Sequence, residues 1–319
     1  MTSIPTLPTR RIADLTVSRI GLGCMPNSWG EKADDREGGI AAIQAALDAG
    51  ITLLDTADIY APSWNSMGHN ERLVAEALRT WHAPAEARAR VVVATKGGIT
   101  RQPGEVWGRN GSLDYLLRAV EASAGRLGVD HIDIWQHHRM DPSIPFETQF
   151  EHVLALREQG IVRRIALSNV SAEMLRRAIR LGGGPLEGGV VSVQNEFSPR
   201  YRQWADVLDV CVEHGIAFLP WSPLGGRSFF EQLPTRFATI REIASERGVS
   251  PYVVTLGWHL RLAPVVIPIP GASTVASARD SASAATFELT DDEFARIQAS
   301  LPESDPLHSE LSPEPPFRD

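Results

Sequence analysis

Short runs of aliphatic and β-branched residues alternate with longer amphipathic stretches along almost the whole chain. Strand followed by helix, repeated in this way, is typical of parallel βαβ units. The runs are nearly continuous in apolar character, which suits strands that are covered on both faces. Eight strands are expected, at residues 18–24, 51–57, 90–96, 131–138, 163–169, 190–196, 215–221 and 264–270. Two architectures fit this pattern, an open doubly wound sheet and a closed (β/α)8 barrel.

The amphipathic stretches between these runs predict the helices. Helical periodicity covers residues 40–50, 70–79, 112–128, 146–160, 171–183, 201–214, 235–248 and 251–262. Asn70, Ser112 and Ser171 are expected to begin helices, because their short polar side chains can accept from the first free N–H groups. Gly50 and Gly128 are expected to end helices, because glycine adopts the left-handed conformation of a helix end.

Two observations favour the barrel over the open sheet. An open dinucleotide-binding sheet carries G-x-G-x-x-G after its first strand, but the sequence GLGCMP has Pro26 in place of the third glycine. No linker or change of composition divides the chain. We therefore expect a single-domain (β/α)8 TIM barrel over residues 1–300, with a short N-terminal hairpin segment. Residues 301–319 contain five prolines and five acidic residues and are expected to form an irregular tail.

Charge and composition exclude several classes of protein. The net charge of −8 disfavours a broad nucleic-acid footprint. Cys24 and Cys211 are too far apart to indicate a disulfide framework or a zinc motif. No apolar run reaches the ~18 residues of a membrane span, and the N-terminus lacks a signal-peptide core. We expect a cytoplasmic protein that binds neither nucleic acid nor a membrane; the sequence does not indicate its oligomeric state.

Polar side chains stand where three consecutive predicted strands end. Asp55 and then Tyr60 follow the second strand, Lys96 ends the third, and His137 and His138 end the fourth. Taken singly, each such residue is more often a turn, surface or core residue. Barrel enzymes, however, carry their chemistry at the carboxyl ends of the strands. These residues would therefore face one mouth and form one site.

The residue types at this mouth suggest proton transfer. A phenol has a pKa near ~10 and is a weak acid at neutral pH, and a nearby ammonium lowers that pKa. We expect Asp55 to keep Lys96 charged, Lys96 to acidify Tyr60, and Tyr60 to protonate a carbonyl oxygen. A histidine beside Tyr60 would orient and polarise that carbonyl.

Six motifs in this order, LLDTADIY, VVVATK, DIWQHHR, ALSN, SVQNEFS and PIPGAS, resemble those of the aldo-keto reductase superfamily. The resemblance runs over roughly residues 10–300. It implies a (β/α)8 barrel that binds a nicotinamide cofactor and transfers hydride to an aldehyde or ketone. It also implies a catalytic tetrad made of Asp55, Tyr60, Lys96 and a histidine of the fourth strand.

The family pattern places the catalytic histidine five residues after the aspartate of its strand. Counting from Asp133 selects His138. Neighbouring residues of a strand face opposite sides, so His137 would point away from the mouth, together with Trp135.

The same resemblance implies a set of cofactor-binding residues. Ser168, Asn169 and Gln194 would hold the nicotinamide carboxamide, which needs both donors and acceptors, and Trp221 would stack on the ring. The residues implied near the pyrophosphate are Ser222, Leu224, Gly225, Gly226 and Arg227. The residues implied near the adenosine end are Gly271, Ser273, Thr274 and Arg279.

The adenosine loop departs from the family pattern. Many relatives carry Lys or Arg early in this loop, where this chain reads GAST at 271–274, and Ser277 and Ser281 replace a later Arg and an Asn. Arg279 is the one cation nearby. Because an ionic contact to the 2′-phosphate is the main means of preferring NADP, the resemblance implies NADP(H), while the local charge leaves NAD(H) possible.

Three tryptophans follow the first three strands. Trp29, Trp64 and Trp107 predict an apolar or aromatic wall around a small-molecule carbonyl substrate. The glycine-rich segment 97–112, after Lys96, is long enough to fold over that substrate. The sequence does not specify which carbonyl compound it is.

Two other functions compete with the reductase. Barrels that resemble this one also serve as accessory subunits of potassium channels, so a cofactor-binding sensor or channel subunit is the alternative; the intact tetrad favours the enzyme. A metal-dependent hydrolase needs clustered His and acidic ligands. His137 and His138 are neighbours in a strand and cannot bind one metal, so no metal is expected.

Overall fold

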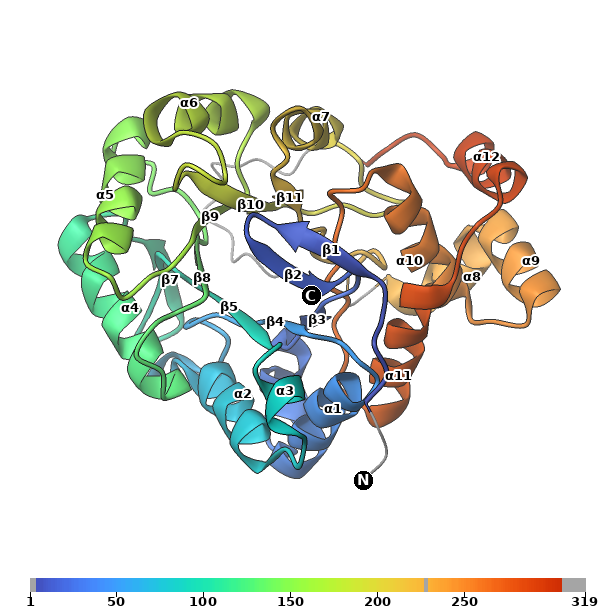
Figure 1. Ribbon diagram of the computed structural model, residues 1–319, viewed down its shortest axis with the longest axis horizontal. Coiled ribbons are helices and arrows are strands. Elements are labelled where there is room, and N and C mark those ends of the chain that lie inside the picture. The colour runs from blue at the N-terminus through green and yellow to red at the C-terminus, as the bar shows by residue number, and fades with distance from the viewer. Residues whose placement is uncertain (1–3, 227–228, 306–319) are drawn as a thin grey trace.

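The computed structural model describes residues 4–226 and 229–305. Seven parallel strands form one curved sheet in the order β11-β10-β9-β8-β5-β4-β3, which Figure 1 shows inside a ring of helices. The strands are β3 (Leu22–Gly23), β4 (Leu53–Asp55), β5 (Val92–Gly97), β8 (Ile134–His137), β9 (Ile165–Ser168), β10 (Val190–Gln194) and β11 (Ala217–Phe218). Each lies within one of the predicted strands, except that β5 extends one residue further, to Gly97.

The eighth predicted strand, 264–270, closes the sheet without forming a regular strand. The N–H groups of Gly21 and Gly23 donate to carbonyls of this segment on one side, and Ile267 donates to Phe218 of β11 on the other. The segment contains three prolines, which have no N–H to donate and so prevent a continuous ladder. The sheet is nevertheless closed, and the predicted (β/α)8 fold class is confirmed.

Helices surround the barrel in Figure 1. They are α1 (Arg36–Asp48), α2 (His69–Thr80), α3 (Ala85–Arg88), α4 (Leu113–Leu127), α5 (Phe146–Glu158), α6 (Ala172–Gly182), α7 (Ala205–His214), α8 (Leu233–Arg236), α9 (Ala238–Arg247), α10 (Pro251–Leu262), α11 (Val275–Ser283) and α12 (Asp291–Ser300). Short 3-10 helices lie at Met25–Ser28, Gly30–Ala33, Trp64–Ser66, Phe230–Gln232 and Ala284–Thr286.

Most of the predicted helix ends lie where the sequence placed them. Ser112 and Ser171 are the N-caps of α4 and α6, and Gly128 ends α4 in the left-handed conformation with φ 70°. Gly50 follows the last residues of α1 with φ 95°.

Asn70 is not the N-cap of α2, so that prediction was wrong. The helix begins at His69, after Gly68 with φ 77°. Asn70 is buried in the first turn, where it accepts from Thr56 Oγ1 at 2.6 Å and donates to the Cys24 carbonyl at 2.8 Å. Its side chain therefore fixes α2 to the loops that follow the first two strands of the barrel.

A hairpin closes the amino-terminal end of the barrel. Strand β1 (Thr9–Ile12) pairs antiparallel with β2 (Leu15–Ser18), and Figure 1 shows the pair lying across the ring of strands. Ile12 and Val17 are fully buried, in one cluster with the apolar interior of the barrel. Because apolar side chains fill this end, the polar side chains of the strands gather at the opposite, carboxyl end.

The last described residues, 301–305, follow α12. Residues 301–305 form no regular element, and the Asp305 N–H donates to the Arg200 carbonyl. The rest of the predicted tail, 306–319, lies outside the described residues. Within residues 4–226 and 229–305, no helix has the length and apolar character needed to cross a bilayer.

Candidate active site

Lys96 is the centre of the polar cluster at the barrel mouth. Its ammonium nitrogen lies 2.6 Å from Asp55 Oδ2, 3.1 Å from the Tyr60 hydroxyl and 2.8 Å from the Thr56 carbonyl. Asp55 ends β4, and Lys96 is near the end of β5, its neighbour in the sheet. Lys96 is 0% exposed, Asp55 3% and Tyr60 6%. The structure therefore brings together three of the four residues of the implied tetrad.

Two glutamines hold the second oxygen of Asp55. Gln136 Nε2 donates to Asp55 Oδ1 at 3.0 Å, and Gln194 Nε2 donates to the same oxygen at 2.8 Å. Gln194 Nε2 also donates to Gln136 Oε1 at 3.1 Å. Gln136 was absent from the residues expected at the site. It stands two positions before His138, so the alternation of the strand places both on one face, and this signal could have identified it.

Burial governs the protonation of Tyr60 and Lys96. Burial raises the pKa of Tyr60 above its ordinary value, and the nearby ammonium of Lys96 offsets this only in part. Burial alone would lower the pKa of Lys96, but the charges of Asp55 and Tyr60 outweigh it, so that pKa is raised. Lys96 thus lowers the pKa of Tyr60, as expected, but burial outweighs this effect and leaves that pKa above the value of a free phenol. At neutral pH the pair consists of a neutral phenol and an ammonium.

The two neighbouring histidines face opposite sides of the barrel wall. The His138 ring lies edge-on to Tyr60, with 5.7 Å between ring centroids. The His137 ring lies edge-on to Trp135 at 6.1 Å, and Trp135 packs in the cluster between sheet and helices. Burial holds the pKa of His138 well below its ordinary value, and the charge of Lys96 lowers that pKa further. His138 is thus the histidine beside Tyr60, and it is neutral.

A second carboxyl group lies behind Tyr60. Asp58 is buried in the loop between Asp55 and Tyr60, and its backbone N–H donates to the Lys96 carbonyl. Burial, then the charge of Glu71, raises the pKa of Asp58 well above its ordinary value. Glu71 accepts from Thr95 Oγ1 at 2.6 Å and from Arg126 Nε at 2.5 Å. Asp58 is therefore a buried carboxylic acid rather than a surface turn residue.

The residues implied at the nicotinamide carboxamide lie side by side. Asn169 has φ 57°, and its amide nitrogen donates to the His138 carbonyl at 3.1 Å and to Ser168 Oγ at 2.9 Å. Asn169 Oδ1 accepts from Trp221 Nε1 at 3.1 Å. Ser168 Oγ donates to the Gln194 carbonyl at 2.8 Å. Ser168, Asn169, Gln194 and Trp221 therefore form one connected group, and Asn169 joins it to the His138 backbone.

The segment implied near the pyrophosphate follows Trp221. Ser222, Gly225 and Gly226 have φ 48°, 93° and 90°. A Cβ on Gly225 would lie 2.4 Å from the Phe229 ring, so only glycine fits there. The half-buried Leu224 side chain packs against two clusters of the core. Arg227 lies outside the described residues.

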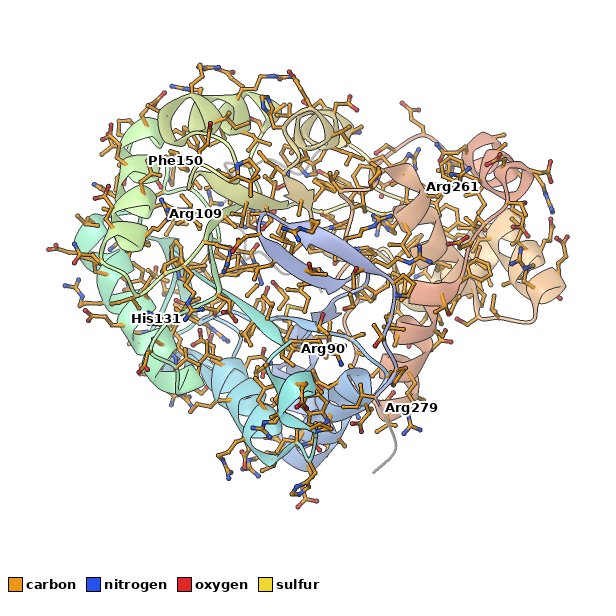
Figure 2. The ribbon with its side chains drawn as sticks, in the orientation of Figure 1. Arg90, Arg109, His131, Phe150, Arg261 and Arg279 are labelled. Atoms are coloured by element: carbon orange, nitrogen blue, oxygen red, sulfur yellow. The ribbon has the colours of Figure 1, made fainter. Side chains whose placement is uncertain are left out.

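The segment implied near the adenosine end leads into α11. Gly271 bridges to Gly23 of β3, and Ser273 is half-buried. Thr274 is the N-cap of α11, where its hydroxyl accepts from the Ser277 N–H in a reciprocal capping box. Arg279 is exposed, and Figure 2 shows it on the outer side of the molecule at α11.

The segment after Lys96 folds into a hairpin rather than an irregular loop. Strand β6 (Ile99–Gln102) pairs antiparallel with β7 (Val106–Arg109). The hairpin brings Trp107 to Trp29, with 6.5 Å between ring centroids and 41° between ring planes. Trp64 is 39% exposed. Its backbone N–H donates to Glu105 Oε1, at the turn of this hairpin, at 3.1 Å. Two of the three tryptophans expected as a wall are thus in contact.

Among the residues that the structure describes, no group of three or more His, Cys, Asp or Glu side chains is arranged to hold a metal ion.

Comparison with known proteins finds similarity over almost the whole chain. The model of the Aldo/keto reductase family matches residues 19–302. An uncharacterised oxidoreductase of Schizosaccharomyces pombe is 33% identical over 293 residues, 91% of this chain and 88% of its own. A probable aldo-keto reductase of Glycine max is 28% identical over 317 residues, 91% of this chain and 87% of its own. The crystal structure of an aldo-keto reductase from Klebsiella pneumoniae with NADPH matches 93% of this chain and 96% of that chain, with a TM-score of 0.74 and 28% identity.

Proposed function

This chain is an oxidoreductase of the aldo/keto reductase family, and on that premise we propose that it reduces an aldehyde or ketone to an alcohol with NADPH. The observation that carries the proposal is the contact of the Lys96 ammonium with both Asp55 and the Tyr60 hydroxyl at the barrel mouth. A buried phenol beside a fixed ammonium is suited to giving a proton to an oxygen that becomes an alkoxide.

The proposed roles follow from the protonation of each group. Tyr60 is the general acid, because its raised pKa keeps the proton on the phenol at neutral pH. Once Tyr60 has given that proton away, the ammonium of Lys96 stabilises the phenolate that remains. Asp55 keeps Lys96 charged and oriented, and Gln136 and Gln194 keep Asp55 in place. His138, held neutral, donates a hydrogen bond to the carbonyl oxygen.

The nicotinamide cofactor supplies the hydride when it is bound. The residue types near His138 fit such a group, since Ser168 and Asn169 carry the donors and acceptors that a carboxamide needs. To bind it, they would exchange their present hydrogen bonds to the Gln194 and His138 carbonyls for bonds to the carboxamide. The half-buried indole of Trp221, fixed by its hydrogen bond to Asn169, offers a flat face to the ring. Gly225 and Gly226 allow the backbone to approach a pyrophosphate closely. We propose these residues, with Ser222, Leu224 and Arg227, as the cofactor site.

NADPH is the proposed cofactor because the Klebsiella pneumoniae relative is described in complex with NADPH. We propose that Gly271, Ser273, Thr274 and the exposed Arg279 contact the adenosine end of the cofactor. Arg279 is the one cation among them that could pair with a 2′-phosphate. NADH remains the alternative cofactor. The relatives compared above are named as an oxidoreductase and as aldo-keto reductases, and none is named as a channel subunit.

The test is a titration of the purified protein with NADPH and with NADH, followed by its tryptophan fluorescence, and then an assay of NADPH oxidation with a panel of aldehydes and ketones. We expect quenching by NADPH at lower concentration than by NADH, and turnover of some carbonyl compounds. Equal affinity for the two cofactors would overturn the NADPH preference. Tight binding without turnover of any carbonyl would overturn the reductase.

A further inference from the structure

Arg101 is an unusually buried cation near the proposed site. It lies in β6, directly across the ladder from Trp107 of β7. Its side chain is 5% exposed, although arginine side chains are seldom fully buried unless they are paired. Nothing in the proposed chemistry uses it, so its burial calls for another explanation.

The Arg101 guanidinium lies against two indole rings. Its central carbon is 4.7 Å from the centroid of the Trp107 ring and 5.6 Å from that of Trp29. Both distances lie within the range of a cation–π contact. A planar guanidinium can contact two aromatic faces at once, which a compact ammonium cannot do equally well. The contact between the two tryptophans is therefore built around this side chain.

The nitrogen atoms of the same guanidinium bind three other groups. Nη1 donates to the Ala61 carbonyl at 2.7 Å and Nη2 to the Pro62 carbonyl at 3.2 Å. Nε donates to Glu105 Oε2, and the other oxygen of Glu105 accepts from the Trp64 N–H at 3.1 Å. Arg101 thus joins the loops that follow β3, β4 and β5, all of them at the mouth.

The group that Arg101 organises lies beside the proposed general acid. Ala61 and Pro62 directly follow Tyr60 in the chain. Tyr60 is buried in a small cluster with Ile99 of β6, and Trp107 packs against that cluster. Trp107 is therefore held against the cluster that contains the proposed proton donor, and Trp29 lies on Trp107.

We propose that Arg101 is a specificity-determining positioning residue. It holds Trp29 and Trp107 as a rigid aromatic wall beside Tyr60, and this wall selects carbonyl compounds that carry a flat aromatic or apolar group on the carbonyl carbon. The inference rests on the proposed reductase function, because it concerns the substrate of the same site. Rigid aromatic side chains give large contact areas at low cost in conformational entropy, which is why a fixed wall favours a flat substrate.

The experiment compares an aromatic aldehyde, benzaldehyde, with a short aliphatic one, propanal, in the wild-type protein and in Arg101→Lys. The lysine keeps the positive charge but loses the planar contacts and the bonds to Ala61 and Pro62. We expect the KM for benzaldehyde to rise about tenfold or more, while the KM for propanal and the dissociation constant of NADPH change less than about threefold. Comparable losses for both aldehydes, or no loss for benzaldehyde, would show that Arg101 does not shape a selective wall.

Matched variants separate this role from damage to the hairpin. Glu105→Gln keeps acceptors for the Trp64 N–H and for Arg101 Nε and leaves the guanidinium between the two rings, so the KM for benzaldehyde should rise less than in Arg101→Lys. Gln102→Ala changes an exposed residue of the same strand and should leave both KM values as they are. Trp107→Leu should reproduce the selective loss of benzaldehyde if Arg101→Lys does not fold. Equal behaviour of Gln102→Ala and Arg101→Lys would contradict the proposal.

A readout without turnover keeps the two proposals distinguishable. If the wild-type protein reduces no carbonyl, the proposed function fails. The wall itself is then tested by the indole N–H signals of Trp29 and Trp107 in an NMR spectrum, assigned with single Trp→Phe variants. Arg101→Lys should shift and broaden both signals. The signal of Trp258, which is buried in another core cluster, should stay in place. Unchanged signals for Trp29 and Trp107 would overturn the positioning role.

Discussion

The ammonium nitrogen of Lys96 lies 3.1 Å from the phenol oxygen of Tyr60, and both side chains are buried. Lys96 lies in β5 and Tyr60 in the loop after β4, and these two strands pair directly with each other, so their pairing fixes the approach. A charged donor at this distance stabilises the deprotonated phenol more than the protonated one. The pair is therefore suited to a proton that leaves the phenol during the reaction and returns afterwards.

Replacing Lys96 tests its part in this pair. Lys96→Met removes the ammonium and leaves Asp55 without its cation, and we expect kcat for carbonyl reduction to fall about a hundredfold or more. The dissociation constant of NADPH should change little. Lys32, the other lysine of the chain, is 48% exposed, and Lys32→Met is the matched control. A Lys96→Met protein that folds and keeps its kcat would contradict the role assigned to Lys96.

The pH dependence of reduction follows from the raised pKa of Tyr60. Reduction needs the protonated phenol, so the rate should stay level through neutral pH and fall only above the ordinary phenol pKa of ~10. The reverse reaction, alcohol oxidation, needs the phenolate and should rise with pH over the same range. A pH–rate profile of the reduction measures this directly. A fall centred between pH 6 and 8 would contradict a phenol whose pKa is raised.

The sequence predicted much of this site because its residues sit at regular positions in a regular fold. The alternation of strands and helices specifies the barrel, and the strand ends specify Asp55, Lys96 and His138. It did not predict the net effect on the pKa of Tyr60, because burial depends on how closely the surrounding loops pack. Nor did it predict the irregular closing strand, where three prolines interrupt the ladder.

The residues that sequence reasoning missed depend on contacts between distant segments. Gln136 could have been found from strand alternation, since it shares a face with His138. Arg101 could not, because its value comes from the hairpin that places it against Trp29, a residue more than seventy positions earlier. Asn70 was assigned to a cap on its residue type alone, whereas its buried partners Thr56 and Cys24 set its actual role.

Gln136 is expected to act through Asp55. Gln136→Leu removes one of the two amide donors to Asp55 Oδ1, and leaving that buried oxygen less satisfied costs about 1–3 kcal/mol of folding stability. We expect kcat to fall about tenfold while the KM for NADPH is nearly unchanged. Gln136→Asn, which keeps an amide, should retain part of kcat. A Gln136→Leu protein with the wild-type kcat would show that Asp55 needs no second support.

Asp58 is expected to make stability fall as pH rises. Its pKa in the folded protein is raised above the unfolded value of ~3.9, so the native state holds a proton that the unfolded state has lost. Asp58 makes its full contribution to the free energy of unfolding below ~pH 4. Above this pH the contribution declines by up to about 1.4 kcal/mol per pH unit, until the pH reaches the pKa of Asp58 in the folded protein. Relative to wild type, Asp58→Asn should therefore gain stability with increasing pH.

Denaturant unfolding of Asp58→Asn and wild type at several pH values from 4 to 9 measures this difference. Asp130→Asn removes a carboxyl from the surface and serves as the control for the loss of one charge. A constant difference between Asp58→Asn and wild type over this range would contradict a raised pKa for Asp58.

Tyr60 is the proton donor on which the proposed reaction depends, and single-turnover reduction in Tyr60→Phe tests this role. Enzyme saturated with NADPH is mixed with an aromatic aldehyde, and the loss of NADPH absorbance is followed for wild type and variant. The account predicts unchanged NADPH binding and hydride transfer slowed about a hundredfold or more in Tyr60→Phe. Hydride transfer at the wild-type rate in a variant that binds NADPH normally would show that the proton comes from elsewhere.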